Sequence, residues 1–163
     1  MIQLKILIVS DTHGRLGNLT RVLSKVKPID MLWHLGDVEG DEEQIRAMAG
    51  CEVRFVKGNN DSFSDLPREE LFELGAYTVY MTHGHRNYVH WGLDKLMERT
   101  MEMGADIALF GHTHVPLIQK QYGITLVNPG SLERPRQEGH KPTFIVAELD
   151  RMGEIHFTLN ILN

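Results

Sequence analysis

The sequence of 163 residues contains a single cysteine, Cys51. One cysteine cannot form an internal disulfide and fits a reducing compartment, so we expect a cytoplasmic protein. No apolar run approaches the roughly 20 residues that a membrane-spanning helix needs. The amino-terminal stretch MIQLKILIVSD is interrupted too soon for a signal peptide. We therefore expect neither secretion nor contact with a membrane.

Clusters of basic residues are also missing. The chain has 17 Lys and Arg against 22 Asp and Glu, which gives a formal net charge of -5. Proteins that hold nucleic acid stably present a basic patch to the phosphate backbone, so we expect no stable nucleic-acid complex. The sequence has no repeat, linker or low-complexity segment, and this length suits one core. We predict a single domain over residues 1–163 and leave a homo-oligomer open.

An apolar run near the amino terminus ends abruptly in polar residues. The stretch from Lys5 to Gly14 reads KILIVSDTHG, and its lack of alternation predicts a strand buried on both faces. Asp11 and His13 follow the carboxyl end of that strand, where ligands bind in layered α/β folds. A carboxylate and an imidazole together suit a borderline divalent metal. Alone, the pattern is equally explained by Asp11 capping a helix and His13 in solvent.

Hydrophobic spacing predicts strands alternating with helices over most of the chain and strands alone at the end. The expected helices are 16–27, 42–48 and 90–103. The expected strands are 4–9, 31–35, 52–57, 71–74, 77–82, 107–110, 117–121, 124–128, 143–149 and 154–159, with a loop at 62–70 and a meander formed by the last four. This order predicts an α/β fold with two sheets packed face to face.

Five predicted strands end in residues that can bind metal: Asp11 and His13, Asp37, Asn59, His83, and His112 with His114. Each has a structural explanation by itself, since Asp and Asn favour turns beside glycine. Their recurrence at the same end of successive strands, which would make them neighbours in a sheet, predicts a shared site. Seven ligands exceed the needs of one four-coordinate ion, so two ions are implied. Such ions usually share a carboxylate, and Asp37 is the natural bridge.

The order of these motifs from about Ser10 to Ser131 resembles that of the calcineurin-like metallophosphoesterases. The motifs are D-x-H, G-D, G-N-x-D, H-G and G-H-x-H. The later segments 128–131 (NPGS) and 134–136 (RPR) resemble the compact single-domain phosphodiesterases of this family. The resemblance implies a four-layer αββα sandwich, with two mixed β-sheets packed face to face between flanking helices, and a dinuclear metal centre. By motif position, one ion would be held by Asp11, His13, Asp37 and His114, and the other by Asp37, Asn59, His83 and His112.

Position 60 departs from the pattern of the larger family. Many members have a histidine after the asparagine, and that histidine protonates the leaving oxygen. This chain has Asn60 at the same position. A neutral amide cannot act as a proton donor with a pKa near 7. His85, two residues after a ligand, is a candidate substitute acid, and Asp61 is expected to orient a ligand. The predicted catalytic residues are therefore Asp37, Asn59, Asn60 and His85. No motif spacing places the remaining histidines in the site, and we expect them to be structural or at the surface: His34, His90, His140 and His156.

The resemblance implies a metal-dependent phosphoesterase, and specifically a phosphodiesterase, in which a hydroxide bridging two divalent ions attacks a small phosphoester in line. Mn²⁺ is the first expectation, with Fe, Ni²⁺ and Zn²⁺ as alternatives, because mixed Asp/His/Asn sites accept several ions. The alternative is a non-catalytic interaction module, since a retromer subunit uses the same fold with a degenerate metal site. The complete set of seven ligands favours the enzyme. An exonuclease is disfavoured because a basic patch and an appended DNA-binding region are both missing.

Overall fold

The structure is a computed structural model that describes residues 2–163, except the side chain of Ile2. Its first sheet has the order β10-β9-β1-β2-β3. The strands are β1 (Ile2–Val9), β2 (Met31–His34), β3 (Glu52–Phe55), β9 (Thr143–Asp150) and β10 (Ile155–Ile161). β1, β2 and β3 run parallel, while β9 is antiparallel to both β1 and β10. The sheet is therefore mixed.

The second sheet has the order β4-β5-β6-β8-β7. Its strands are β4 (Glu69–Leu74), β5 (Tyr77–Thr82), β6 (Ile107–Leu109), β7 (Leu117–Gln121) and β8 (Ile124–Asn128). β5, β6 and β8 run parallel in its centre, and the edge strands β4 and β7 are antiparallel to their neighbours. It is mixed as well, as the sequence predicted.

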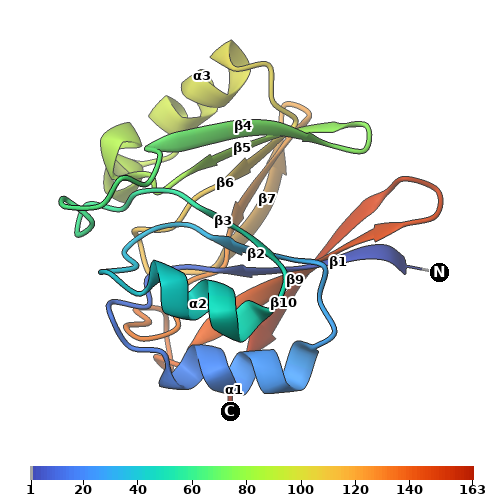
Figure 1. Cartoon of the computed structure of the whole chain (residues 1–163). Coiled ribbons are helices and arrows are strands. Elements are labelled where there is room, and N and C mark those ends of the chain that lie inside the picture. The colour runs from blue at the N-terminus through green and yellow to red at the C-terminus, as the bar shows by residue number, and fades with distance from the viewer. Residues whose placement is uncertain (1) are drawn as a thin grey trace.

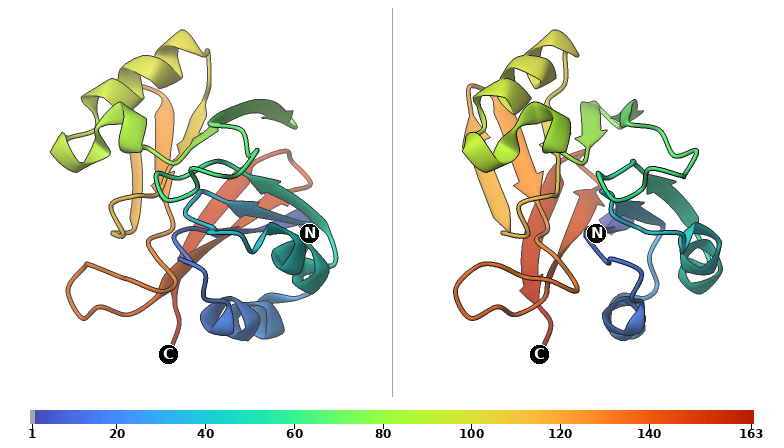
Figure 2. Two further views of the ribbon diagram at one scale, coloured as in Figure 1. Left: turned by 60° about the vertical axis from the view of Figure 1, so that its left-hand side comes forward. Right: turned by 90° about the vertical axis from the view of Figure 1, so that its left-hand side faces the viewer.

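Three helices cover the outer faces of the two sheets. α1 (Gly17–Val26) and α2 (Glu42–Ala49) lie along the first sheet, and α3 (Asp94–Glu102) lies along the second (Figures 1 and 2). Three hydrophobic cores fill the spaces beneath α1 and α2, between the sheets, and beneath α3. The predicted four-layer αββα sandwich is therefore confirmed.

β1 is the central strand of the first sheet, and the burial of its side chains explains its unbroken apolar sequence. Leu7 and Val9 belong to the core beneath α1 and α2. Ile6 and Ile8 point the other way, into the core between the sheets. All four are fully buried, because successive side chains of a strand point to opposite faces and both faces are covered here.

The predicted helix 90–103 is wrong at its amino-terminal end. The chain forms two short 3₁₀ turns, η1 (His85–Asn87) and η2 (Val89–Trp91), and α3 begins only at Asp94. Gly92 separates them with a φ of 135°, a conformation that is essentially restricted to glycine and breaks a helix. β4 also begins within the predicted loop 62–70, because Glu69 and Glu70 pair with the end of β5.

The last four strands do not form one meander. β7 and β8 make a hairpin in the second sheet, whereas β9 and β10 make a hairpin in the first. The segment between β8 and β9 therefore crosses from one sheet to the other. The chain also crosses between the sheets after β3, so the five strand ends with metal-binding residues are not neighbours in one sheet: three belong to the first sheet and two to the second.

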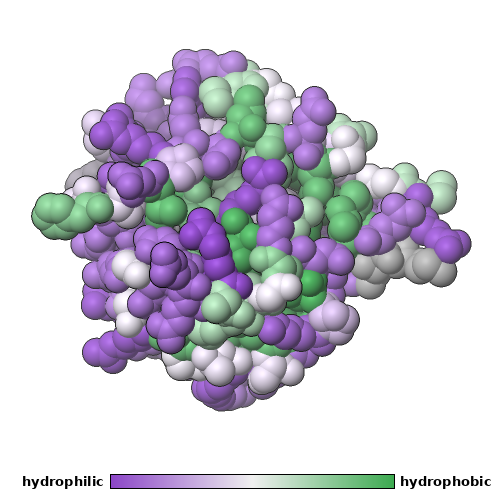
Figure 3. All heavy atoms as spheres, viewed as in Figure 1, coloured by the Kyte–Doolittle hydropathy of each residue, from purple (hydrophilic) through white to green (hydrophobic). Residues whose placement is uncertain are grey.

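The face of the molecule in Figure 3 is covered mainly by hydrophilic residues, with smaller groups of hydrophobic residues between them. Within residues 2–163, no helix has both the length and the apolar character needed to cross a membrane.

Candidate metal centre

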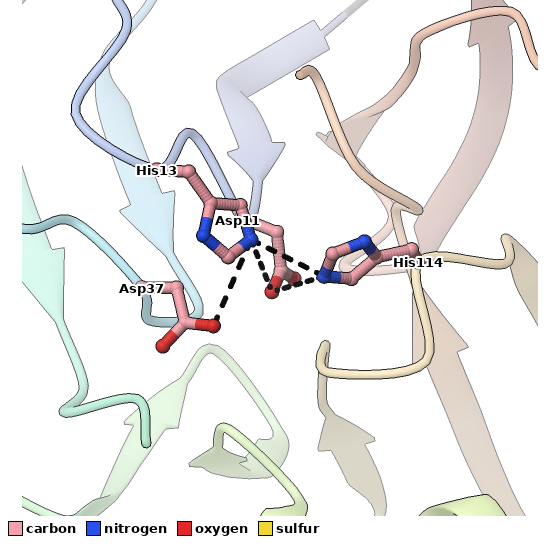
Figure 4. A group of neighbouring side chains, drawn as sticks. All are labelled: Asp11, His13, Asp37 and His114. Carbon is pink, nitrogen blue, oxygen red and sulfur yellow. Dashed lines mark hydrogen bonds and ion pairs between the residues drawn. The ribbon is translucent and has the colours of Figure 1, made fainter. Parts of the chain in front are cut away.

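The predicted metal-binding residues meet where the two sheets face each other. Asp11 and His13 follow β1, Asp37 follows β2 and Asn59 follows β3, all in the first sheet. His83 follows β5, and His112 and His114 follow β6, in the second sheet. Figure 4 shows Asp11, His13, Asp37 and His114 directed toward one another from these loops. The carboxyl ends of parallel strands in both sheets thus supply one site.

The loops that hold these residues have an unusual backbone. Asp11, His13, Asp37, His112 and His114 all have φ values between 49° and 68°. This left-handed region costs an L-residue roughly 1–2 kcal/mol. Such conformations persist where surrounding contacts fix them, and they concentrate at functional sites. Here the Asp11 N–H donates to the Gly36 carbonyl at 3.0 Å, and the His13 N–H donates to the Asp37 carbonyl at 2.9 Å.

Two glycines allow the loops to approach one another closely. A Cβ atom at Gly58 would overlap the Asp37 backbone nitrogen and Oδ1, and a Cβ atom at Gly111 would overlap Ser10 Oγ. Any side chain at either position would push a ligand loop away. The glycines of the G-N-x-D and G-H-x-H motifs therefore serve packing at the site.

The first group of ligands converges within the distances that one ion requires. Asp11, His13, Asp37 and His114 each offer a ligand atom, and these four atoms all lie within 4.8 Å of one another. His114 Nε2 is 3.1 Å from Asp11 Oδ1 and 3.2 Å from His13 Nε2. Two ligands bound at about 2.0–2.2 Å to one ion are roughly 3–3.6 Å apart. This buried Asp/His group could therefore hold a metal ion.

The second group gathers around Asn59. Its Oδ1 is 3.0 Å from His83 Nε2 and 3.1 Å from His112 Nδ1. His83 Nε2 is also 3.4 Å from Asp37 Oδ2, which in turn lies 3.8 Å from His13 Nε2 in the first group. Asp37 Oδ2 thus lies between the two groups, as a bridging carboxylate would.

Hydrogen bonds on the far side of three imidazoles fix which nitrogen faces the site. The Nδ1–H groups donate to acceptors: His13 to Glu39 Oε2 at 3.0 Å, His83 to the Leu35 carbonyl at 2.6 Å, and His114 to the Arg134 carbonyl at 2.7 Å. In neutral imidazoles, this leaves the Nε2 lone pairs directed inward. Outer hydrogen bonds of this kind are typical of metal-binding histidines.

The buried carboxylate oxygen Asp11 Oδ1 is directed at the imidazoles of the site. Asp11 Oδ1 is shielded from solvent and has no hydrogen-bond partner among the described residues. It faces Nε2 of His114, His13 and His83 at 3.1, 3.6 and 3.8 Å. A buried carboxylate needs positive charge beside it, and imidazoles supply that charge only when they are protonated. A cation among these atoms would satisfy the oxygen and the lone pairs together, so the residues fit a metal.

The carboxylates dominate the electrostatics of the site. Burial raises the pKa of Asp11, yet neighbouring imidazoles, first that of His83, hold its pKa well below the ordinary value. Burial alone would lower the pKa of His83, but Asp11 and Asp37 outweigh it and raise that pKa to about 9. Burial and the charge of His83 lower the pKa of His112 to about 4. Asp11 and Asp37 are therefore ionised and attract positive charge.

Asp61 holds the Asp37 loop in place. Its Oδ2 accepts hydrogen bonds from the backbone N–H groups of Asp37 at 2.8 Å, Val38 at 3.3 Å and Gly58 at 2.8 Å. Its Oδ1 accepts another from Glu39 at 2.8 Å. These bonds join the loops after β2 and β3. Asp61 thus orients Asp37 and does not face the metal-binding group.

The other predicted residues also border the site. The Asn60 amide donates to Asp37 Oδ2 at 3.0 Å. The His85 ring centroid lies 5.4 Å from that of His83, and its buried Nδ1 has no partner among the described residues. His34, by contrast, is structural: it is fully buried and bonds to Thr12 Oγ1 at 2.9 Å. The coordinating and catalytic roles themselves stay predictions.

A cavity of about 100 Å³ opens onto the site. It is lined by His13, Asp37, Asn59, Asn60, His90, His112, His114, Arg134 and Arg136. A larger cavity of about 380 Å³ shares Asn60 and extends past Glu39 and Phe63, but none of the seven predicted metal ligands lines it. Of these two cavities, only the smaller one reaches the predicted metal ligands.

Sequence reasoning missed two residues that belong to this environment. The ring centroid of His90 lies 4.4 Å from that of His112, because η2 carries His90 back toward the site. Glu39 bonds to His13 from the far side. Neither residue has a motif spacing that reveals its role. The NPGS segment supports the site through Ser131, whose O–H donates to the Asp11 carbonyl at 2.8 Å.

Comparison with known families and relatives agrees with this geometry. Residues 4–152 match the model of the calcineurin-like phosphoesterase superfamily domain. The probable metallophosphoesterase YsnB of Bacillus subtilis is 33% identical over 134 residues, which cover 82% of this chain and 78% of YsnB. The phosphodiesterase YfcE of Escherichia coli K12 is 28% identical over 159 residues, covering 82% of each chain.

Solved structures share the fold over its whole length. A predicted phosphoesterase from Streptococcus pneumoniae TIGR4 has a TM-score of 0.79 and 28% identity, and 99% of each chain is covered. Vacuolar Protein Sorting 29 from Cryptosporidium parvum has a TM-score of 0.77 and 18% identity, with 100% of each chain covered. At that lower identity the second likeness shows the fold alone.

Proposed function

This chain belongs to the calcineurin-like phosphoesterase superfamily, and we propose that it is a metal-dependent phosphodiesterase that acts on a small phosphoester. The single observation that carries the proposal is the buried Asp11 Oδ1, which has no hydrogen bond within residues 2–163 and faces three imidazole nitrogens. A buried carboxylate among imidazole nitrogens is a donor set that suits a divalent cation. The phosphodiesterase YfcE among its relatives supports the same reaction class.

The proposed centre holds two divalent ions. Asp11, His13, Asp37 and His114 would hold one, and Asp37, Asn59, His83 and His112 the other. When bound, such ions supply Lewis acidity and a hydroxide nucleophile for in-line displacement at phosphorus. The protein residues have separate tasks. Three acceptors orient the imidazoles by accepting their Nδ1–H groups: the carboxylate of Glu39 and the carbonyls of Leu35 and Arg134. Asp61 holds the Asp37 loop.

Position 60 offers no proton donor for the leaving group. Asn60 lies beside Asp37 and carries a neutral amide, which cannot donate a proton at neutral pH. His85 is the nearest substitute on sequence grounds, and it lies half-buried beside His83. We therefore propose esters with acidic leaving groups as the best substrates.

We propose Mn²⁺ as the first candidate ion. The donor set combines carboxylate, imidazole and amide oxygen, which also suits Fe, Ni²⁺ and Zn²⁺, so supply in the cell selects among them. The half-buried free thiol of Cys51 agrees with the cytoplasm as the proposed compartment. The complete ligand set favours hydrolysis over a purely structural interaction module, although Vacuolar Protein Sorting 29 shares the fold.

The test measures hydrolysis of bis(p-nitrophenyl) phosphate by purified protein supplied with each ion in turn. We expect turnover with Mn²⁺ and loss of turnover in excess EDTA. A double variant, Asp11→Asn with His114→Ala, serves as the inactive reference. Hydrolysis that is equal in wild type and this variant would come from a contaminant. No hydrolysis of any phosphodiester with any of the four ions would overturn the proposed function.

A further inference from the structure

Two arginines lie at the cavity of the metal-binding site without a counter-charge from the protein. Arg134 and Arg136 belong to the segment between β8 and β9 and line the same cavity as His13 and His114. Among the described residues, no carboxylate oxygen lies within 4.0 Å of either guanidinium. The adjacent carboxylate, Glu133, pairs with Arg15 at 3.3 Å instead. Both charges are therefore available to a ligand.

The backbone of these arginines is tied to the metal-binding loops. The His114 Nδ1–H donates to the Arg134 carbonyl at 2.7 Å, and the Arg136 N–H donates to the His114 carbonyl at 3.0 Å. The Arg134 N–H donates to Ser131 Oγ at 2.8 Å, and the Ser131 hydroxyl donates to the Asp11 carbonyl at 2.8 Å. The two side chains thus start from fixed points beside the site and do not hang on a free loop.

Charge matching indicates what these arginines bind. Two divalent ions are balanced by the carboxylates of Asp11 and Asp37, a hydroxide and a phosphodiester, which is a monoanion. Glu39 adds one negative charge, but its carboxylate binds the His13 Nδ1–H and pairs with neither arginine. The two guanidinium groups therefore have no paired anion. The guanidinium fork matches phosphate oxygens in a bidentate way, and a phosphate monoester carries close to two negative charges at neutral pH.

We infer that Arg134 and Arg136 form a subsite for a second phosphate group of the substrate, beside the phosphodiester that is cleaved. This inference rests on the proposed function and narrows its substrate class to phosphodiesters that carry a further phosphate. The second phosphate is bound and not hydrolysed. Its role is to position the diester in the cavity.

The test uses a pair of substrates with the same leaving group. One is thymidine 5′-(p-nitrophenyl phosphate), and the other is the same molecule with an added 3′-phosphate. We expect the wild type to have a KM at least about tenfold lower for the substrate with the added phosphate, the effect of one charged hydrogen-bonded contact. The ratio of the two KM values removes effects that both substrates share.

Three variants locate the origin of this ratio. In the double variant Arg134→Ala with Arg136→Ala, the ratio should fall close to one, whatever happens to either KM alone. Arg136→Lys keeps the charge and loses the fork, so its ratio should be intermediate. Arg151→Ala is the matched control, because Arg151 is exposed in the turn between β9 and β10 and does not line the cavity, and it should keep the wild-type ratio. A similar fall in Arg151→Ala would assign the effect to net charge and overturn the inference.

A binding measurement separates this inference from the proposed function. Calorimetry with metal-loaded protein gives the Kd of thymidine 3′,5′-bisphosphate and of thymidine 5′-phosphate. An advantage for the bisphosphate that depends on the arginines supports the subsite even if no diester is hydrolysed. Hydrolysis with equal losses for both substrates in the double arginine variant would mean that the arginines bind the scissile phosphate, and the inference would fail.

Discussion

Asn60 holds both carboxylate oxygens of Asp37. Its backbone N–H donates to Oδ1 at 2.9 Å, and its side-chain amide donates to Oδ2 at 3.0 Å. Oδ2 is the atom that lies between His13 Nε2 and His83 Nε2, at 3.8 and 3.4 Å. Position 60 therefore borders the carboxylate that we propose as the bridge, where a proton donor could reach a leaving group.

We predict that Asn60→His raises activity on substrates with poor leaving groups by up to roughly 10²-fold, because an imidazole can donate a proton near neutral pH. Good leaving groups should change little. Wild type and variant are compared on phosphodiesters and phosphomonoesters of graded leaving-group pKa, with saturating metal. Asn60→Ala is the control, because it loses the same side-chain bond to Asp37 and adds no donor. An unchanged slope in Asn60→His would show that position 60 does not face the leaving group.

The protein should bind two divalent ions per chain, and chelation should abolish hydrolysis. The physical reason is that the pKa of a water molecule is low enough to give hydroxide near neutral pH only when the water is bound to the ions. Elemental analysis and a calorimetric titration give the stoichiometry. A value that stays at one ion under saturating Mn²⁺, or full turnover in excess EDTA, would contradict the dinuclear centre.

Asp37→Asn should reduce kcat much more than His85→Ala. The first change weakens the group placed between both sets of ligands, whereas the second removes at most an optional acid. Both variants are assayed with saturating metal, and circular dichroism shows whether each is folded. If His85→Ala lost about 100-fold or more, the usual range for general acid catalysis, His85 would become the leaving-group acid.

Asp61→Asn should weaken metal binding by about 10- to 100-fold, as loss of an outer partner of a ligand typically does. It should also lower the free energy of unfolding by about 2–3 kcal/mol. Both oxygens of the Asp61 carboxylate now accept hydrogen bonds from backbone N–H groups, and the NH₂ group of an asparagine cannot accept them. Urea denaturation and metal titration measure the two effects. Asp65→Asn is the control, since Asp65 is exposed in the same loop and should change neither quantity.

His34 should make the fold sensitive to acid. Burial lowers the pKa of His34 from 6.5 to about 4. Its Nδ1 accepts a hydrogen bond from the Gly36 N–H at 3.1 Å, and a proton added to Nδ1 would break that bond. The unfolded chain thus takes up this proton first, and stability falls as the pH drops from 6.5 to about 4. The loss reaches about 3 kcal/mol at most, from 1.36 kcal/mol per pKa unit.

Urea denaturation of wild type and His34→Gln across this pH range isolates that contribution. The difference in unfolding free energy between the two proteins should shrink as the pH falls, because only the wild type loses the stabilising effect of a neutral His34. His140→Gln alters an exposed histidine and should run parallel to the wild type. A constant difference between wild type and His34→Gln would contradict the assignment.

The amino-acid sequence by itself predicted most of the strands and helices and the polar residues that the structure brings together at the site. Its apolar runs match β1 and β2 closely, because short strands buried on both faces need continuous hydrophobic side chains. The polar residues after each run are local features, and so are the glycines beside them. The family, the αββα layers and the expected ligand set followed from the order of these motifs.

Only the tertiary structure decided how those residues meet. His13 and His114 lie 101 positions apart in the chain, yet their Nε2 atoms are 3.2 Å apart. No local pattern encodes that contact, because it depends on two sheets packing with the ends of their parallel strands together. The same packing brings His90 to His112 and Arg134 to the cavity, and local spacing encodes neither contact. Spacing along the chain sets which face a side chain occupies, whereas the partner across that face is set by the packing of distant segments.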